Sequence, residues 1–344
     1  MGQPRDTSSV TFSFVAPVFN EAGSLPEFHA QLKAVADKLG EPYEIILVND
    51  GSRDESLEVI HRLAREDEHV KYVDLSRNFG HQEALTAGYD YASGQAVISL
   101  DSDCQHPPEL IPELVARWRE GYEVAYTVRQ NVADLPAWKR AAARWFYRCF
   151  GKLSGLDVTD QADFRLLDRR VVRALRQVRE KARFLRGLVK WVGFRQVAVP
   201  YQALPRYAGR TGYSLRKMLR VASAGLLNFS VLPLRLAGGL GAALLGGAVL
   251  YALVTLVLWR LGWSSLTANL VVLALGMLGV QLAALGLLGE YVGRIYDEAK
   301  DRPIYVVRDA VGFEQAAPKE AEEPTPASAK HIPSAEPRKI RLFT

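Results

Sequence analysis

The sequence predicts an α/β fold in which a mostly parallel sheet carries helices on both faces, followed by a hairpin of two transmembrane helices. Up to about residue 213, short apolar runs alternate with amphipathic helical stretches, which is typical of a parallel sheet with crossover helices. Farther along the chain, the segments 236–259 and 266–289 are almost wholly apolar. Because about 20 apolar residues span the hydrocarbon core of a bilayer, each segment is long enough to cross a membrane.

Five short apolar runs in the first part of the chain are the predicted strands of the sheet. They are residues 11–18, 43–49, 70–75, 95–100 and 122–127. Two intervening helices begin with the spacing of a capping box, Ser24 with Glu27 and Ser52 with Glu55. In such sheets ligands bind beyond the carboxyl ends of the strands. Polar stretches follow the first, second and fourth strands there, with the sequences PVFNE, VNDGS and DSDCQH.

Composition and charge narrow the class of protein. The chain has 344 residues with 49% hydrophobic content, which suits two units with a large core and appended segments. The net charge of +5 is small for this length, which argues against a nucleic-acid-binding protein. Cys104 and Cys149 match no metal-ligand spacing, so we expect free thiols in a reducing compartment. The N-terminal residues lack the basic and apolar regions of a signal peptide.

The charges around the two apolar segments predict the orientation of the membrane region, residues 230–291. Cations cluster before the first segment and after the second, whereas the turn between them contains one, Arg260. The flanking cations are Arg216, Lys217, Arg220, Arg235, Arg294, Lys300 and Arg302. By the positive-inside rule, both termini of this integral protein of the inner membrane are expected in the cytoplasm. Small residues spaced four apart in the first segment favour a homo-oligomer, although small residues are also common in membrane helices generally.

The remaining segments complete the predicted domain organisation. Residues 1–213 form a cytoplasmic head, and residues 292–313 form a cytoplasmic segment after the hairpin. Two basic amphipathic helices, 136–153 and 214–229, are predicted to lie in the membrane interface. An ordinary amphipathic helix packed on the sheet would show the same pattern. Residues 314–344 are rich in Pro, Ala, Glu and Lys and are predicted to be disordered.

The stretch DSDCQH predicts a metal site at the end of the fourth strand. Asp101, Asp103 and Gln105 alternate along the chain, so their oxygens can point to the same side. Oxygen ligands suit a hard divalent cation, Mg²⁺ or Mn²⁺, which also takes oxygens from a substrate phosphate. The alternative is a turn in which Asp103 caps the helix opened by the prolines that follow.

The stretches PVFNE and VNDGS are candidates for nucleotide binding. An acidic residue after a strand can hydrogen-bond a base or ribose, as in nucleotide-binding folds, although both stretches also fit ordinary turns. The head contains neither G-x-G-x-x-G nor G-x-x-x-x-G-K-[ST]. Dinucleotide binding and Walker-type phosphate binding are therefore unsupported.

Six stretches together resemble the polyprenyl-phosphate glycosyltransferases of inverting family 2. They are PVFNE, VNDGS, RNFGHQEALTAG, DSDCQHPPEL, DFRLLDRR and YAGRTGYSLRKML. The chain is most similar to the bactoprenol glucosyltransferase and dolichyl-phosphate mannosyltransferase group, over about residues 10–307. The resemblance implies a glycosyltransferase A-type, Rossmann-like head that transfers sugar from a nucleotide sugar to a membrane polyprenyl phosphate.

The resemblance also implies roles for individual residues. The nucleotide would be held by Pro17, Asn20, Glu21, Asp50, Gly51 and Ser102. The metal and the donor diphosphate would be bound by Asp101, Asp103 and Gln105, with Asp103 in the catalytic set. Asp163 would face the sugar. The phosphates would be gripped by Arg129, Arg165, Arg206 and, as a weaker candidate, Arg210.

The sequence departs from the pattern of this family at three positions. Cys104 stands where Leu is usual, His106 where Asp is usual, and Ala162 where Gly is usual. None of these changes removes a metal-binding oxygen. Ala in place of Gly at position 162 can change the local turn, and with it the direction in which Asp163 points. His81 and His106 are expected to support the site or the fold rather than to act as acid or base.

The leading expectation is transfer of glucose from UDP-glucose to undecaprenyl phosphate with inversion. A dolichyl-phosphate mannosyltransferase-type enzyme that uses GDP-mannose is the alternative. A processive polysaccharide synthase would carry a Gln-x-x-Arg-Trp motif and more membrane spans, and this sequence has neither. A catalytically silent membrane scaffold or nucleotide-sugar sensor would have lost the metal carboxylates, and both are present.

Overall fold

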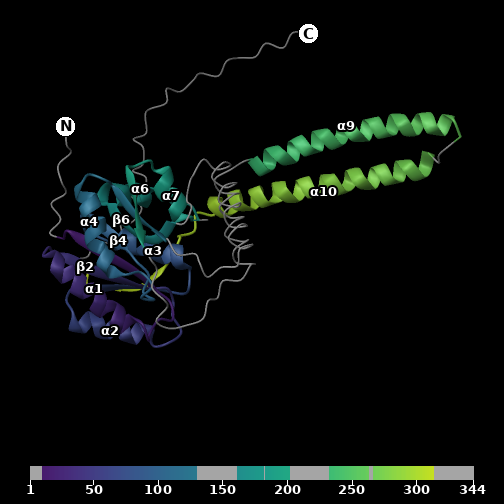
Figure 1. Ribbon diagram of the computed structural model, residues 1–344. Coiled ribbons are helices and arrows are strands. Elements are labelled where there is room, and N and C mark those ends of the chain that lie inside the picture. The colour runs from purple at the N-terminus through teal and green to yellow at the C-terminus, as the bar shows by residue number, and fades with distance from the viewer. Residues whose placement is uncertain (1–9, 130–160, 182, 202–231, 263–265, 314–344) are drawn as a thin grey trace, which may run out of the picture. The chain divides into compact units, whose positions relative to one another are not determined.

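The computed structural model describes residues 10–129, 161–181, 183–201, 232–262 and 266–313 (Figure 1). The two predicted interfacial helices, 136–153 and 214–229, and the predicted disordered tail, 314–344, lie outside the described residues. The side chain of Arg129 and all of Arg206 and Arg210 also lie outside them. The predicted domain boundaries within these segments therefore stay predictions.

The described residues of the head form a central sheet of eight strands with the order β7-β5-β6-β4-β1-β2-β3-β8. The strands are β1 (Phe12–Val18), β2 (Tyr43–Asn49), β3 (Val70–Leu75), β4 (Ala96–Ser99), β5 (Val124–Arg129), β6 (Gln161–Asp168), β7 (Gln196–Tyr201) and β8 (Val307–Val311). The five predicted strands are all present as β1 to β5. Four neighbouring pairs are parallel and three, β3·β8, β4·β6 and β5·β6, are antiparallel. The predicted α/β class is confirmed, with a mixed sheet.

Helices connect these strands and follow them. The helices described in the head are α1 (Leu25–Leu39), α2 (Ser56–Glu66), α3 (His81–Tyr91), α4 (Ile111–Arg119), α6 (Arg169–Gln177) and α7 (Leu185–Trp191), with a 3₁₀ turn, η1, at Pro108–Leu110. The stretch DFRLLDRR divides between two elements, because most of it is strand β6 and Asp168 then caps α6. The carboxylate of Asp168 accepts a hydrogen bond from the backbone N–H of Arg170, as an N-cap residue does.

The two predicted capping boxes are not formed. Ser24 does precede α1, but its hydroxyl makes no cap bond and donates instead to Glu21 Oε2 at 2.7 Å. Helix α2 begins at Ser56, so Ser52 lies before the helix rather than at its cap. The Ser52 hydroxyl accepts the backbone N–H of Asn20 at 3.1 Å. The Ser24 hydroxyl bonds a residue of its own loop, whereas the Ser52 hydroxyl bonds the loop after β1, a pairing that local spacing in the sequence does not reveal.

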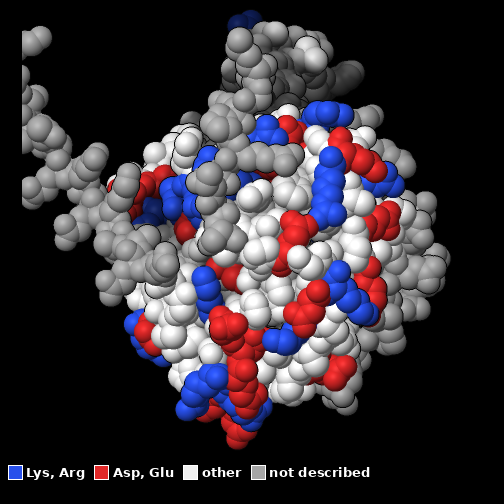
Figure 2. Space-filling view, turned by 90° about the vertical axis from the view of Figure 1, so that its left-hand side faces the viewer, with Lys and Arg blue, Asp and Glu red and all other residues white. Residues whose placement is uncertain are grey.

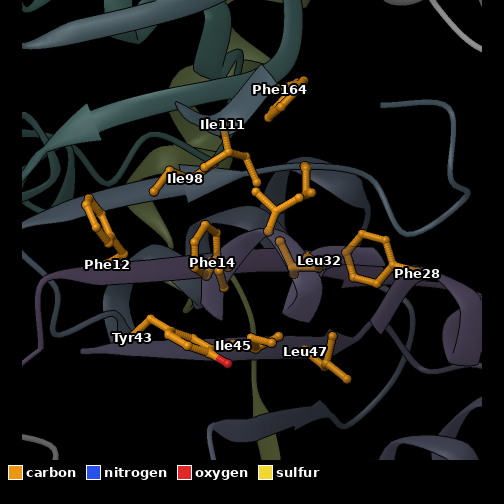
Figure 3. Close-up of a cluster of buried hydrophobic side chains, with 14 of the residues drawn as sticks. Phe12, Phe14, Phe28, Leu32, Tyr43, Ile45, Leu47, Ile98, Ile111 and Phe164 are labelled. Atoms are coloured by element: carbon orange, nitrogen blue, oxygen red, sulfur yellow. The ribbon is translucent and has the colours of Figure 1, made fainter. Parts of the chain in front are cut away.

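The core lies against β1, whose seven residues are all buried. A continuous apolar run of this kind is expected for a strand covered on both faces. On one face, Phe12 and Phe14 belong to a cluster with Phe28 and Leu32 of α1 and Ile111 of α4 (Figure 3). Burying each of these side chains contributes about 1.5–3 kcal/mol. The cluster fixes β1 and β4 side by side, and the loops that follow them carry the candidate site.

The antiparallel strand β6 brings a second group of residues to this edge. Ser99, the last residue of β4, pairs with Arg165 in β6, so the residues of β6 before Arg165 lie beyond the carboxyl end of β4. Strand β5 ends at Arg129 on the same edge, because Val128 pairs with Gln161. The stretch DFRL is therefore placed beside DSDCQH although about 60 residues separate the two in the chain.

Two long apolar helices follow the head segments. Helix α9 (Leu232–Arg260) and helix α10 (Leu266–Ala299) run side by side in opposite directions (Figure 1). Within them, Ala237–Arg260 and Leu273–Ala299 are long and apolar enough to cross a membrane, and 6% and 0% of their most apolar windows are buried. The helices agree with the predicted hairpin, but α10 continues to Ala299, past residue 289, where the second span was expected to end.

Acidic and basic side chains are interspersed on the surface of the head. On the face in Figure 2, Lys and Arg alternate with Asp and Glu, and the described residues of this face form no continuous basic patch. This pattern agrees with the small net charge of +5. It gives no support to binding of a polyanion on this face.

We expect Gly88→Ala to lower the melting temperature of the protein in detergent. A Cβ at Gly88 in α3 would lie 2.2 Å from Val15 Cγ1 and 3.2 Å from Val48 Cγ2, so α3 would have to move off the sheet. Overpacking of this kind costs about 1–3 kcal/mol, which exceeds the gain of about 1 kcal/mol in helix propensity. Gly23→Ala is the matched control, because no atom lies within 4 Å of its added Cβ. Equal melting temperatures for the two variants would contradict this packing.

Candidate active site

The loops after β1 and β2 are held together by hydrogen bonds between their polar groups. Asn20 adopts the left-handed conformation with φ 56°, and its side-chain oxygen accepts the backbone N–H of Arg53 at 2.8 Å. The backbone N–H of Glu21 donates to the Ser56 hydroxyl at 2.8 Å. Asn20 and Glu21, both predicted to hold the nucleotide, thus lock the two loops together. A direct contact of either residue with nucleotide stays a prediction.

A small cavity lies between these loops and the start of α3. It has a volume of about 170 Å³ and is lined by Pro17, Val18, Phe19, Asp50, Asn78, Gly80 and His81. Two of these seven residues, Pro17 and Asp50, belong to the predicted nucleotide-binding set. The other five were not predicted to bind nucleotide, and among them Phe19 is 43% exposed. The cavity is a candidate place for part of a nucleotide.

Asp50 shapes this cavity through the backbone of the loop before α3. Its buried carboxylate accepts the N–H groups of Phe79 at 2.7 Å and Gly80 at 3.1 Å. Burial raises the pKa of Asp50, and the two backbone donors oppose this rise only in part. Gly51 has φ +63°, and a Cβ there would lie 2.5 Å from the backbone of Arg77. Gly51 is therefore required for the close approach of the two loops.

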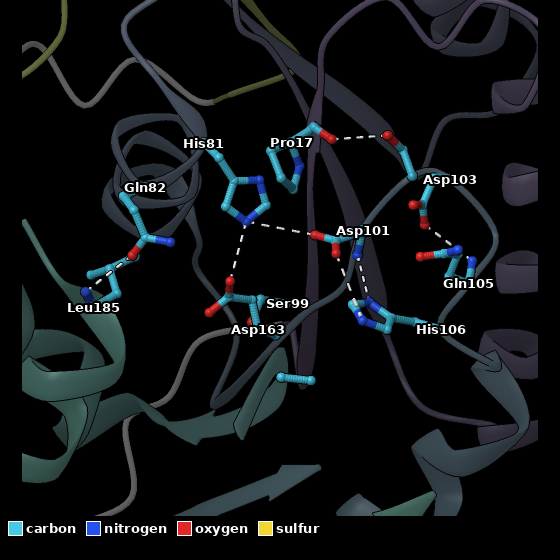
Figure 4. Close-up of polar contacts among 12 residues, drawn as sticks. Pro17, His81, Gln82, Ser99, Asp101, Asp103, Gln105, His106, Asp163 and Leu185 are labelled. Atoms are coloured by element: carbon cyan, nitrogen blue, oxygen red, sulfur yellow. Dashed lines mark hydrogen bonds and ion pairs between the residues drawn. The ribbon is translucent and has the colours of Figure 1, made fainter. Parts of the chain in front are cut away.

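Asp101 faces two histidines at the end of β4 (Figure 4). Its Oδ1 lies 3.6 Å from His81 Nε2, and its Oδ2 lies 3.7 Å from His106 Nε2. The backbone N–H of Asp101 donates to His106 Nδ1 at 3.0 Å, so a neutral His106 carries its proton on Nε2, toward the carboxylate. Oδ1 of Asp101 is buried and has no hydrogen-bond partner among the described residues. His106 therefore orients Asp101, which agrees with its expected supporting role.

Asp103 forms a turn, but it does not cap the following helix as the alternative to a metal site predicted, because the N-cap of η1 is Pro107. Its Oδ1 accepts the backbone N–H of Gln105 at 3.1 Å, and Cys104 between them has φ 59°. This is an Asx turn, and the hydrogen bond stabilises the loop before η1. Ser102, predicted to contact the nucleotide, is buried and donates to the carbonyl of Pro17 at 2.9 Å. Ser102 thus ties the β4 loop to the β1 loop.

The acidic loop fits a divalent cation that is shared with a substrate. No three acidic, histidine or cysteine side chains surround one point in the described part of the chain. Mg²⁺ and similar ions, however, are often held by one or two carboxylates, with water and substrate phosphates as the other ligands. Oδ1 of Asp101 is buried, has no hydrogen bond within the described residues and lies 3.6 Å from His81 Nε2, so a bound cation would supply its missing partner. Asp101 and Asp103 are the residues that would hold it.

Asp163 is the most strongly held carboxylate of the site. Its oxygens accept two bonds from Arg186, at 3.0 and 2.9 Å, and one from Arg165 at 2.9 Å, while His81 lies at 3.5 Å. Burial alone would raise the pKa of Asp163, but Arg186, His81 and Arg165 together hold it well below its usual value. Asp163 is therefore ionised at neutral pH. With Ala162 before it, Asp163 still points toward His81 (Figure 4).

The backbone around Asp163 is fixed by hydroxyl groups of the neighbouring strands. Ser99 of β4 donates to the carbonyl of Asp163 at 2.6 Å and accepts a bond from Tyr89 at 3.0 Å. Thr127 of β5 donates to the carbonyl of Phe164 at 2.9 Å. All of these groups are buried, so their bonds act in a medium of low polarity. The position of Asp163 is thus set by the sheet rather than by a mobile loop.

The two arginines that hold Asp163 differ in exposure. Arg165 was predicted to grip a phosphate, but it is 1% exposed, and its Nη2 bonds Asp163 and the carbonyl of Ala162. Its Nη1 is buried and has no hydrogen-bond partner among the described residues. The side chain of Arg186, on α7, is 33% exposed and was not predicted, because no motif surrounds it in the sequence. Arg186 is the arginine of this pair that reaches the surface of the site.

His81 lies between the two acidic groups. It is the first residue of α3, and its ring stands between Asp101 and Asp163 (Figure 4). Burial would lower the pKa of His81, but the bond to Asp163 and the charges of both carboxylates raise it to about 9. The imidazole is thus a cation in this arrangement and bridges the acidic loop to Asp163. The sequence had indicated only a supporting role for it.

Comparisons with known proteins identify the family. Residues 13–176 match the model of glycosyl transferase family 2. The chain is 45% identical over 308 residues to the uncharacterized glycosyltransferase YkcC of Bacillus subtilis (strain 168). The match covers 89% of this chain and 95% of that protein. The chain belongs to glycosyl transferase family 2. It is therefore a glycosyltransferase, and Asp101 and Asp163 lie within the matched residues.

Other relatives match over a length that includes the hairpin as well as the head. The bactoprenol glucosyl transferase of Shigella phage SfV is 36% identical over 304 residues, which cover 86% of this chain and 98% of that protein. Among solved structures, glucosyl-3-phosphoglycerate synthase from Mycobacterium tuberculosis, in complex with Mn²⁺, UDP and phosphoglyceric acid, has a TM-score of 0.44 at 18% identity. That match covers 63% of this chain and 76% of that chain.

We predict that Arg186→Ala lowers the rate of sugar transfer by roughly 100-fold, because Asp163 loses its bidentate partner and can turn within the site. Arg186→Lys should recover only part of the rate, because an ammonium cannot make two parallel bonds. Initial rates at saturating donor measure both effects. Arg117→Ala is the matched control, because Arg117 pairs with Glu120 on the surface of α4. Wild-type rates in Arg186→Ala would show that Asp163 needs no such support.

Proposed function

We propose that this glycosyltransferase transfers glucose from UDP-glucose to undecaprenyl phosphate in the membrane, with inversion at the anomeric carbon. The observation that carries the proposal is the 36% identity to a bactoprenol glucosyl transferase over 304 residues, a length that includes both apolar helices. An enzyme with a soluble acceptor would not need an exposed apolar hairpin. Only 6% and 0% of the most apolar parts of the two helices are buried. The product would be a polyprenyl-phosphate sugar for modification of cell-envelope glycans.

The reaction would need little acid–base help. An oxygen of the acceptor phosphate, already anionic near neutral pH, forms a bond to the anomeric carbon while the bond from that carbon to the nucleoside diphosphate breaks. The two main requirements are to bring two anions together and to stabilise the departing diphosphate. Bound Mg²⁺ or Mn²⁺ would neutralise charge on the diphosphate, and Asp101 and Asp103 would hold the ion, with Gln105 beside them.

Asp163 would act on the sugar as a fixed negative charge. A carboxylate whose pKa is held well below its usual value is a poor base, so proton abstraction is not its task. Its oxygens already accept bonds from Arg186 and Arg165, so it would act through its charge, by stabilising positive charge that develops at the anomeric carbon. Arg186, at the surface of the site, would contact an anionic group of a substrate on the same side.

The apolar hairpin would hold the head at the membrane surface, where the acceptor phosphate lies. Cations before the first helix and after the second support a topology with the head and both termini in the cytoplasm, on the inner membrane. Arg129, Arg206 and Arg210 remain candidates for the acceptor phosphate. Small residues in α9 would allow helices of neighbouring copies to pack in a homo-oligomer.

We expect the purified protein, with Mn²⁺ and undecaprenyl phosphate, to move radiolabel from UDP-glucose into an organic-extractable lipid. Chelation by EDTA should remove the activity, because the donor diphosphate would lose its counter-charge. A parallel series with GDP-mannose and other nucleotide sugars measures donor selectivity. Label found only in water-soluble polymer would favour a synthase, and no transfer from any donor would favour a scaffold or sensor.

The two roles of Asp103 can be separated by a pair of substitutions. Asp103→Asn keeps a side-chain oxygen for the Gln105 N–H but removes the negative charge, whereas Asp103→Ala removes both. If Asp103 binds the metal, both variants lose transfer by at least roughly 100-fold while retaining the wild-type melting temperature. Glu109→Ala, an exposed acidic residue in η1, is the control. An active Asp103→Asn with an inactive Asp103→Ala would assign Asp103 to the turn alone.

A further inference from the structure

The segment after the second apolar helix returns to the head as an edge strand. Residues 300–306 lead from α10 into β8, which pairs antiparallel with β3. The pairing continues at its start, where the Ser76 N–H donates to the carbonyl of Val306 at 2.8 Å. Tyr305 also donates to Asp90 of α3 at 2.7 Å. The strand β8 was not predicted, and the sequence motifs assign it no function.

Arg308 of β8 contacts two points next to the candidate nucleotide site. Its Nη1 donates to Asp74 Oδ2 at 3.2 Å, and its Nη2 donates to the carbonyl of Ser76 at 2.7 Å. Ser76 begins the loop 76–80, whose residues Asn78 and Gly80 line the cavity. One guanidinium thus holds both a side chain of β3 and the start of a cavity-lining loop.

Asp74 continues the network toward the loop after β2. Its Oδ1 accepts the amide of Asn49 at 2.7 Å, and Asn49 Oδ1 accepts the N–H of Ser52 at 3.2 Å. The Ser52 hydroxyl accepts the N–H of Asn20, in the loop after β1, at 3.1 Å. A continuous series of bonds therefore runs from Arg308 through Asp74 and Asn49 to both loops of the predicted nucleotide site.

We propose that Arg308 is a positioning residue for the donor nucleotide, and that β8 thereby couples the end of the apolar hairpin to the donor-binding loops. The inference rests on the proposed function, because it takes the loops at 49–52 and 76–80 to bind a nucleoside diphosphate. Arg308 touches no substrate in this proposal. It acts by holding Asp74 and the Ser76 carbonyl.

The burial of Asp74 is the physical reason that Arg308 matters. Arg308 is 58% exposed, and an ion pair between two exposed groups has little effect by itself. The Asp74 side chain, however, is 3% exposed, so removal of Arg308 leaves a buried carboxylate without its positive charge. The least costly response is for Asp74 to turn toward water and release Asn49. The loop at 49–52 would then lose the bond that holds the Ser52 N–H.

Amide hydrogen exchange on the full-length protein in detergent, without nucleotide, tests the network directly. Arg308→Ala is expected to speed exchange about ten-fold at residues 50–53 and 77–80, while β1 at the centre of the sheet stays as protected as in the wild type. Arg308→Lys, which keeps a positive charge beside Asp74, should recover most of the protection. Arg302→Ala removes the same charge from an exposed position before β8 and should change nothing. Unchanged exchange at both loops in Arg308→Ala would overturn the inference.

Transfer kinetics and UDP binding give the functional readout. Arg308→Ala should raise the KM for the nucleotide sugar and the Kd for UDP about ten-fold with kcat within two-fold of wild type, because the loops bind the nucleotide equally before and during reaction. If the wild type transfers sugar and Arg308→Ala has a wild-type KM, the inference fails and the proposed function stands. If the wild type neither binds UDP nor transfers sugar, the proposed function fails, and Arg308 is then not a donor-positioning residue.

Discussion

The carboxylate of Asp163 is buried in a cluster with Arg165, Arg186 and His81, and the architecture of the site depends on this ion cluster. A buried charge that loses its partner costs about 3–5 kcal/mol, so the elements that supply the partners must stay in place. Arg165 lies on the same strand as Asp163, Arg186 comes from α7 and His81 opens α3. The cluster thus joins three elements from distant parts of the chain. It also keeps the ionised carboxylate of Asp163 at one position on the sheet.

The acidic loop at Asp101 differs from the Asp163 cluster in how its carboxylate is paired. Asp163 is paired with Arg165, Arg186 and His81, whereas Oδ1 of Asp101 is buried and has no hydrogen bond within the described part of the chain. The Nε2 atoms of His81 and His106 lie 3.6 and 3.7 Å from the oxygens of Asp101. Both rings therefore orient the carboxylate of Asp101 at distances longer than a hydrogen bond. A site of this kind is incomplete by itself, which suits a cation that arrives with a diphosphate. Under the proposed function, Asp163 would act on the sugar and Asp101 on the charge of the donor diphosphate.

The strand β8 connects this chemistry to the apolar hairpin. It extends the sheet beyond β3, and Arg308 on it reaches the network that holds the loops after β1 and β2. The same segment contacts α3 through Tyr305 and Asp90, and α3 carries His81 at its other end. The end of the hairpin is therefore joined to both sides of the candidate nucleotide cavity. For an enzyme with one soluble and one membrane-bound substrate, such a link would align the donor with the surface at which the acceptor lies.

The sequence alone determined the features that depend on local pattern. Five strands, the apolar hairpin and the acidic pair Asp101 and Asp103 were predictable, because apolar runs and strand-end carboxylates are visible in short windows. Tertiary structure decided the features that depend on pairing between distant residues. The antiparallel strands β6 and β8, the place of Arg186 beside Asp163, and the use of Ser52 by a loop rather than a helix cap are of this kind. Their partners lie tens to hundreds of residues away, and no local spacing encodes which hydroxyl or guanidinium will meet which carboxylate once the sheet has formed.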